Sequence, residues 1–448
     1  MRSARCLSLV FQGALQVLRS VLLALWQLTW RRPAERTDPL PTNSMPIVLI
    51  PGLMAFDGDL KETVAALRAR GLNVHATRLG PVSSNHDRAC ELFYALKGGR
   101  VDFGAEHSAK HGHSRFGPSH ADGLLPDWDA EHPIILITHS QGAGTALVLQ
   151  HLLATGDFFG PQHATTAGWV QAVVSIAAPL NGAANIHDAV WGAPRPAPAK
   201  ADGAAADEQF CGPWTSGVGF LVTIGYVLHV LVGWSARVRS AWDWQLDQWR
   251  LSVRDLPHLA LQTHPILRST DTALYELTPA GAAVRNARLL PHAGCYYVAL
   301  PAQITHGADA LPLPSAPPLY AVLAALHAAG APIGGARQSD GVVPVESQCF
   351  PTGHPHRHVA ELTAPPRPPP ARAAARAARA TPQRAPSPCE PSQRAQLRGR
   401  LRRGAWNYAD ASPVGHGSAA LYVGSELFEH ALRVIVPAII EAVGADGS

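Results

Sequence analysis

The sequence has few charged residues and few cysteines for its length of 448 residues. Charged residues make up 16%, against about 25% in ordinary globular domains, while hydrophobic residues make up 47%. This balance excludes a chain that is disordered throughout. The six cysteines form no CxxC pair and follow no regular spacing, so the sequence indicates no disulfide framework.

Positive charge is concentrated in two segments of the chain. Residues 1–32 have five arginines and no acid, and residues 363–403 have ten arginines and one acid, Glu390. Because these segments contribute +5 and +9 to a net charge of +4, the other residues together carry −10. A nucleic-acid-binding domain would be expected to carry its positive charge on the folded body. The acidic body therefore argues against nucleic acid as a partner.

The N-terminal residues 1–44 begin with a mostly apolar, acid-free segment from Cys6 to Trp30. Arg19 divides this segment into runs shorter than the ~20 residues that span a bilayer. The pattern favours a signal or anchor segment, and with it a membrane-associated or secretory location. The alternatives are a surface-lying amphipathic helix and an organellar transit peptide that is removed.

Strand-like and helix-like segments alternate from Met45 onward. Short continuous apolar runs are typical of buried parallel strands, and the helical segments between them show an apolar face or follow directly on a turn. The pattern predicts an α/β domain with a mostly parallel sheet and helices on both faces. The expected strands are residues 46–50, 74–79, 133–138 and 170–177, with helices at 60–72 and 143–155.

Three segments interrupt this pattern. Residues 193–207 and 365–403 are rich in alanine and proline, and we expect both to be disordered. For the second segment a solvated linker is favoured over a tether to an anionic surface. Residues 217–234 are uncharged and mostly apolar, as a membrane span would be. Because their position between core elements would split the sheet across a bilayer, a lid is favoured.

A serine follows the third expected strand in a sharp strand–turn–helix context. The sequence runs Thr138-His-Ser-Gln-Gly142 and then continues into a helix. This is the setting of a nucleophile elbow, although Thr138 replaces the first glycine of the G-x-S-x-G pattern. The sequence therefore predicts Ser140 as a nucleophile; the alternative is a serine at a helix N-terminus.

A catalytic serine needs a histidine as base and an acid that orients this histidine. In this type of fold the acid follows the serine in the sequence, and the histidine follows the acid. Asp340 and His416 both lie in loop-like segments in that order, but the chain has 22 histidines, so order alone supports them only partly. The backbone N–H groups of Gln141 and Leu53 are the expected donors of an oxyanion hole.

Histidine and acidic residues are dense in residues 84–91 and 101–117. Imidazole and carboxylate together suit a closed zinc site, so these segments predict a metal site. Spacing alone does not choose among His107, His111 and His113. The alternative is a surface loop that happens to be rich in histidine.

Several blocks together resemble a known family. The sequence resembles the zinc-containing thermoalkalophilic bacterial lipases and their eukaryotic homologues from about Met45 to the C-terminus. The blocks that carry the resemblance are 80–91, 101–117, the Ser140 turn, Leu246-Asp-Gln-Trp249, Ser269-Thr-Asp-Thr-Ala273, Asp340-Gly341 and Gly404-Ala-Trp-Asn407.

The resemblance implies an α/β-hydrolase fold with a zinc-pinned insertion at about 80–120 and a helical lid region at about 183–250. By resemblance, the residues in the zinc-ligand positions are Asp87, His107, His113 and Asp247. Such a site has no open position, so the zinc is expected to be structural. Asp340 and His416 take the positions of the triad acid and base.

The sequence also departs from the family pattern. Pro51 stands where the family has histidine, and substrate selectivity is expected to change. Ser418 stands where an acidic calcium ligand is needed, so calcium binding is doubtful. Residues 363–403 form an insertion that divides the domain into residues 45–362 and 404–448.

The sequence predicts a serine carboxylic-ester hydrolase, a lipase that releases fatty acids from acylglycerols at a lipid–water interface. The alternatives are an acyl hydrolase or acyltransferase acting on phospholipids or galactolipids, and a non-catalytic lipid-binding protein of the same fold. The sequence supports association with a membrane surface and leaves the oligomeric state open.

Overall fold

The computed structural model describes the following residues: 39–55, 58–183, 226–227, 229–231, 243–261, 263–267, 269–303, 338–363, 390–414, 419, 421 and 425–446. The N-terminal segment to residue 38, residues 193–207 and most of the lid candidate 217–234 lie outside the described residues. Among the described residues, no helix is long and apolar enough to cross a membrane.

A seven-stranded sheet forms the centre of the domain, and every named pair of neighbouring strands in it is parallel. In spatial order its strands are β2 (Val74–Ala76), β1 (Ile47–Ile50), β5 (Ile134–His139), β6 (Val170–Ile176), β7 (Tyr296–Leu300), β9 (Trp406–Tyr408) and β8 (His356–His358). The predicted parallel α/β sheet is confirmed.

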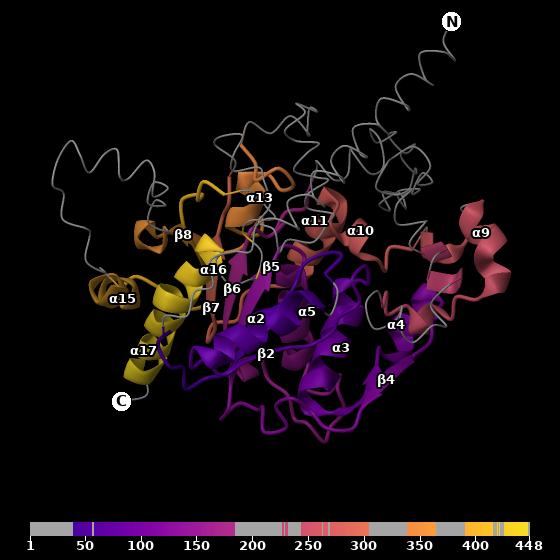
Figure 1. Ribbon diagram of the computed structural model, residues 1–448, viewed down its shortest axis with the longest axis horizontal. Helices are drawn as coiled ribbons and strands as arrows, with labels where there is room; N and C mark the ends of the chain where they lie inside the picture. The colour runs from indigo at the N-terminus through magenta and orange to yellow at the C-terminus, as the bar shows by residue number, and fades with distance from the viewer. Residues whose placement is uncertain are drawn as a thin grey trace, which may run out of the picture.

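Helices cover both faces of this sheet (Figure 1). Side chains alternate along a strand, so in β5 Ile135 and Ile137 face one layer while Ile134 and Leu136 face the other. The first layer contains α2 (Gly58–Ala69), α15 (Glu390–Arg398), α16 (Glu426–His430), a π-helical turn (Ala431–Ile435) and α17 (Val436–Asp446). The second contains α3 (Asn85–Lys97) and α5 (Gly142–Ala154).

The remaining elements are shorter. Strands β3 and β4 form an antiparallel pair, and α4 lies between them in the sequence, within the insertion expected at about 80–120. The bounds of these elements are β3 (Gly99–Asp102), α4 (Ala105–His111), β4 (Phe116–His120), η1 (Ala167–Trp169), η3 (Asp247–Trp249), η4 (Val253–Asp255), α9 (Leu256–Ala260), η5 (Pro265–Leu267), α10 (Ala273–Glu276), α11 (Pro279–Arg288), α13 (Val345–Cys349) and η6 (Ala360–Leu362).

The last part of the segment expected to be disordered is folded. Residues 390–398 form α15, and Leu397 and Leu401 are buried against the helices of the first layer. Arg394 Nε donates to the carbonyl oxygen of Arg433 at 2.8 Å. The expectation of disorder is therefore wrong for residues 390–403. Leu397 in the helix and Leu401 just after it seat this segment on the neighbouring apolar layer.

A buried ion pair connects the C-terminal end of α2 to the last helices. The Arg70 guanidinium donates to both carboxylate oxygens of Glu429, at 2.7 and 2.8 Å, and both side chains are at most 4% exposed. Arg433 lies 3.3 Å from the same carboxylate. The two-pronged contact fixes the C-terminal end of α2 against the C-terminal helices.

Arg70→Met should therefore lower the free energy of unfolding by about 3 kcal/mol, because the Glu429 charge stays buried without its main partner. The measurement is urea unfolding at pH 7. The double variant Arg70→Met/Glu429→Met should lose less than the single variant, since neither charge of the Arg70–Glu429 pair is then left buried without its partner. An equal or larger loss in the double variant would contradict this account.

Candidate active site and metal cluster

Ser140 lies in the turn between β5 and α5. Its φ is +53°, a left-handed conformation that is uncommon for a residue other than glycine. The Ser140 backbone N–H donates to the carbonyl oxygen of Ile176, at the end of β6, at 3.0 Å. The serine side chain thus stands at the carboxyl edge of the sheet, where the chain turns sharply from strand to helix. This is the backbone geometry of a nucleophile elbow.

Small residues after the serine let α5 approach the neighbouring strand and helix. A Cβ atom at Gly142 would lie 2.4 Å from the carbonyl oxygen of Ile50 and 2.9 Å from that of Pro51. A Cβ atom at Gly144 would lie 2.5 Å from the Asn85 side chain. The elbow therefore packs directly on the end of β1 and on the start of the loop that follows it.

This loop, residues 51–55, is held by a buried guanidinium from α3. Arg88 is fully buried and donates to the carbonyl oxygens of Pro51 and Gly52 in the loop and of Gly80 at 3.0 Å. Its Nε donates to the Thr145 hydroxyl of α5 at 3.0 Å. One side chain thus connects the loop after β1 with the helix that follows the serine.

Both residues expected to form the oxyanion hole lie next to this connection. Leu53 is in the loop and is 8% exposed, and the next residue, Met54, donates its N–H to the Pro81 carbonyl oxygen at 2.8 Å. Gln141 directly follows the serine and is 2% exposed, and its side chain donates to the Ser83 carbonyl oxygen at 3.0 Å. The backbone at both positions is therefore held in place by neighbouring contacts.

Asp340 is buried in a turn that lies close to the end of β7. Its carboxylate accepts the N–H groups of Val342 and Val343 at 2.9 and 2.7 Å. The Gln348 side chain donates to the carbonyl oxygens of Val343 and Ala302, at 2.9 and 3.1 Å. Since Ala302 follows β7, Gln348 holds the Asp340 turn at the carboxyl edge of the sheet, the edge that also carries Ser140.

His416 lies outside the described residues. The chain just before it is attached to the same sheet edge: the Ser412 N–H donates to Pro301 at 2.9 Å, and Gln303 donates to Ser412 at 2.8 Å. Two segments therefore contact the chain that follows β7: the segment that contains Asp340 and the segment that precedes His416.

A second group of side chains lies at the N-terminal end of α3, at the base of the insertion. Four residues each offer one ligand atom, and these atoms lie within 4.8 Å of one another: Asp87, His107, His113 and Asp271. The Nε2 atom of His107 is 3.3 Å from Asp87 and 3.2 Å from Asp271, and that of His113 is 3.1 Å from Asp271. The cluster could hold a metal ion.

Three of the four predicted ligands are in this cluster, and the fourth prediction, Asp247, is wrong. Asp271 takes its place. Asp247 is exposed at the start of η3, whereas the following residues face the cluster. Gln248 donates to the second carboxylate oxygen of Asp87 at 3.0 Å, and the Trp249 ring lies 5.3 Å from that of His113. The Leu-Asp-Gln-Trp motif thus supports the cluster through its amide and its ring.

The carboxylates and imidazoles of the cluster shift one another's pKa values. Burial raises the pKa of Asp271, but the neighbouring His107 and His113 outweigh this effect and hold the pKa below its usual value. Burial lowers the pKa of His107, but Asp271 and Asp87 outweigh it and raise the pKa to about 9. Two buried carboxylates facing two imidazoles therefore favour a cation between them.

The donor atoms of the cluster fit a metal ion. One oxygen each of Asp87 and Asp271 and the Nε2 atoms of His107 and His113 are buried, and these four atoms have no hydrogen-bond partner of good geometry among the described residues. Unpartnered buried donors and acceptors are costly, and a shared ion would satisfy all four. His86 stacks on His107, with ring centroids 3.7 Å apart, and orients this ring. His111 is outside the group of four.

Sheet order, helices on both faces and the turn at Ser140 define an α/β-hydrolase fold. A family model described as "Lipase-like, C-terminal domain" matches residues 44–164. The matched range includes the elbow and three residues of the metal cluster, but not Asp271 or Asp340.

The chain is similar to bacterial lipases over part of its length. It is 30% identical over 296 residues to a lipase of Staphylococcus hyicus, a match that covers 59% of this chain and 41% of that protein. It is 34% identical over 139 residues to Lipase 2 of Staphylococcus aureus, covering 28% of this chain and 20% of that protein. The chain therefore spans less than half the length of these relatives.

Solved structures support the fold over most of the chain. The crystal structure of Staphylococcus hyicus lipase matches with a TM-score of 0.62 at 22% identity, covering 93% of this chain and all of that one. EstA from Clostridium botulinum matches with a TM-score of 0.56 at 22% identity, covering 92% and 90%.

Arg88→Lys should lower the free energy of unfolding by about 2 kcal/mol or more, because an ammonium group cannot reach all the carbonyl oxygens and the hydroxyl that the guanidinium contacts. Denaturant unfolding measures the loss. The matched control is Arg100→Lys, at an exposed position of β3, which should change stability by less than about 0.5 kcal/mol. Equal losses of unfolding free energy in the two variants would show that the buried contacts of Arg88 stabilise the protein no more than an exposed arginine does.

Proposed function

We propose that this protein is a serine carboxylic-ester hydrolase, a lipase that releases fatty acids from acylglycerols. The observation that carries the proposal is Ser140 at a left-handed φ in the turn between β5 and α5, at the carboxyl edge of an α/β-hydrolase sheet. Similarity to bacterial lipases in the range that contains this turn supports it.

In the proposed reaction the Ser140 hydroxyl oxygen attacks the ester carbonyl carbon while His416 takes the hydroxyl proton. The backbone N–H groups of Leu53 and Gln141 stabilise the negative oxygen that forms. His416 then protonates the departing alcohol, and a water molecule activated by the same histidine releases the fatty acid. Asp340 orients the histidine. Support for its role comes from its carboxylate, which backbone N–H groups hold at the same sheet edge as Ser140.

We propose that the metal of the cluster is zinc. Imidazole nitrogen and carboxylate oxygen suit Zn²⁺, and the ligands would be Asp87, His107, His113 and Asp271. Because four protein ligands complete a tetrahedral shell, the ion would stabilise the insertion and take no part in the ester chemistry. In that role it joins α3, the α4 segment and the chain before α10.

We further propose that the substrate is reached at a lipid–water interface, with a lid over the site and the N-terminal segment at a membrane surface. A lid excludes water from the reaction and exposes an apolar face to lipid when it opens. The low charge content and the uncharged residues 217–234 support this part of the proposal.

Ser140→Ala should reduce the hydrolysis of long-chain p-nitrophenyl esters by about 10⁴-fold or more, because the nucleophile is lost while the backbone turn remains. The assay compares the initial rates of purified proteins at equal concentration. Ser119→Ala, at an exposed position of β4, is the matched control and should keep the wild-type rate. Full activity in Ser140→Ala would refute the assignment.

Metal analysis of the purified protein should find about one zinc per chain. Asp271→Ala should lose the metal and unfold at a lower temperature, because two histidines and one carboxylate remain without the fourth ligand. Asp247→Ala should keep both the metal and the melting temperature. Loss of zinc from Asp247→Ala with retention in Asp271→Ala would reverse the ligand assignment.

A further inference from the structure

A pocket of about 290 Å³ opens beside α2, next to the loop after β1. Its walls come from that loop, from one side of α2 and from the residues that follow β2. Since β1 and β2 are parallel, the pocket borders the carboxyl edge of the sheet at its β2 end. The lining residues are Pro51, Ala55, Leu60, Lys61, Val64, Ala65, Arg68, Ala76, Thr77, Arg78, Leu79, Leu124 and Gln245. We call this the α2 pocket.

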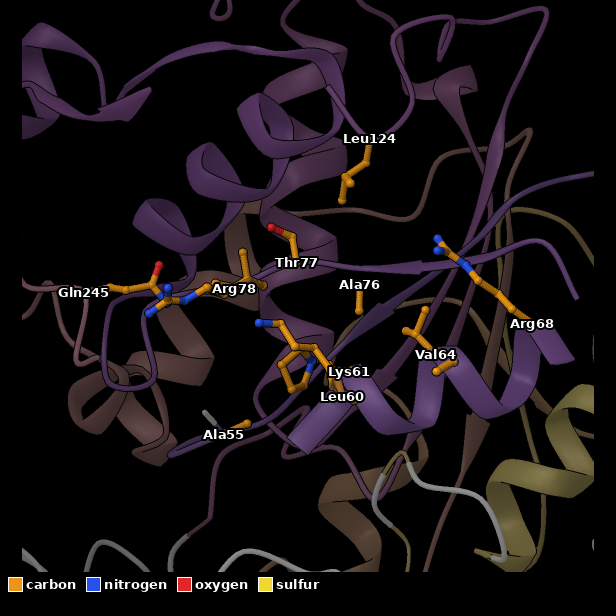
Figure 2. Close-up of a pocket in the computed structure, with 13 residues that line it drawn as sticks. Ala55, Leu60, Lys61, Val64, Arg68, Ala76, Thr77, Arg78, Leu124 and Gln245 are labelled. Carbon is orange, nitrogen blue, oxygen red and sulfur yellow. The ribbon is translucent and has the colours of Figure 1, made fainter. Parts of the chain in front are cut away.

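The lining combines positive charge with apolar surface. Of the described lining residues, three are basic and none is acidic. In Figure 2, Lys61, Arg78 and the Thr77 hydroxyl lie toward one end, Arg68 lies at the other, and aliphatic side chains lie between them. Such a lining matches a ligand that has both an anionic group and a hydrocarbon chain.

Neighbouring contacts hold two of the basic side chains in position. Arg78 is paired with Asp243 at 2.7 Å, which orients its guanidinium at the pocket and offsets part of its charge. Arg68 donates to the Val74 carbonyl oxygen at 2.9 Å, along the edge strand. With Lys61 they give the described lining three basic side chains and no acidic one. A positive site with fixed donors recognises carboxylate or phosphate oxygens.

We propose that the α2 pocket binds the carboxylate end of a fatty acid. A neutral lipid would gain nothing from the three basic residues, and a free inorganic anion would gain nothing from the eight apolar ones. The choice of a fatty acid rests on the proposed function, because ester hydrolysis releases one, and a carboxylic acid is ionised at pH 7. Pro51 and Ala55 line the pocket and belong to the loop that contains Leu53, so a bound product contacts the loop proposed to form the oxyanion hole.

Calorimetric titration of decanoate into the full-length Ser140→Ala variant tests the proposal, because no ester chemistry is then needed. Ala65→Trp places a large ring in the pocket from the exposed side of α2, and Lys61→Met removes one charge. Each should weaken decanoate binding about tenfold or more. The matched control is Ala69→Trp, an exposed position of the same helix that does not line the pocket, and it should bind as the parent does.

Three ligands define the chemistry. Decanol should bind at least tenfold more weakly than decanoate, and inorganic phosphate should also bind more weakly. Decanoate affinity that is unchanged in both Ala65→Trp and Lys61→Met would overturn the site. Equal affinity for decanol would overturn the role of charge, and equal affinity for phosphate would overturn the role of the chain. Decyl phosphate that binds while decanoate does not would overturn the fatty acid in favour of a phospholipid headgroup.

The proposal and the proposed function fail separately. A protein with Ser140 intact that hydrolyses no ester, while its decanoate binding is lost in Ala65→Trp, would keep the pocket and refute the lipase. A protein that hydrolyses esters, but whose decanoate binding is the same in Ala65→Trp and Ala69→Trp, would keep the lipase and refute the pocket.

Discussion

The guanidinium of Arg88 is the contact on which the candidate active site depends. It is fully buried, and its hydrogen bonds reach the loop after β1, the carbonyl oxygen of Gly80 and the Thr145 hydroxyl of α5. A buried charge is tolerated only where polar groups surround it, so these segments are fixed relative to one another. The preceding residue, Asp87, points into the metal cluster. One turn of α3 thus connects the metal site to the loop beside the proposed nucleophile.

This connection links the proposed structural metal to the proposed active site, although the ion takes no part in the proposed reaction. An ion that fixes Asp87 also fixes the first turn of α3, and therefore the position of the guanidinium one residue further on. The proposed ester chemistry lies at the carboxyl edge of the sheet, where Ser140 leaves β5 and the Asp340 turn meets the chain after β7. The fold provides the positions, and the buried polar contacts maintain them.

The sheet and the elbow could be predicted because their signals are local, whereas Asp87, His107 and His113 of the cluster were implied only by the family resemblance. Short apolar runs mark strands, and a serine between strand and helix marks the turn. The fourth ligand could not be predicted from spacing, because it comes from a distant segment that only the fold brings close. The Leu-Asp-Gln-Trp motif is adjacent to the cluster, but its Gln248 faces Asp87 while Asp247 is exposed. Residues 269–273 carry part of the family resemblance, and Asp271 is the one acidic residue among them. The helix at 390–398 could not be predicted, because the alanine- and proline-rich residues before it favour disorder.

The central claim is that Ser140 is an activated nucleophile. The most direct measurement is reaction of the purified protein with a fluorophosphonate, followed by mass spectrometry of its peptides. An activated serine forms a covalent bond to phosphorus as fluoride leaves. The account predicts one adduct per chain, on the peptide that contains Ser140, and none after heat denaturation. An unmodified protein, or an adduct on a different residue, would contradict it.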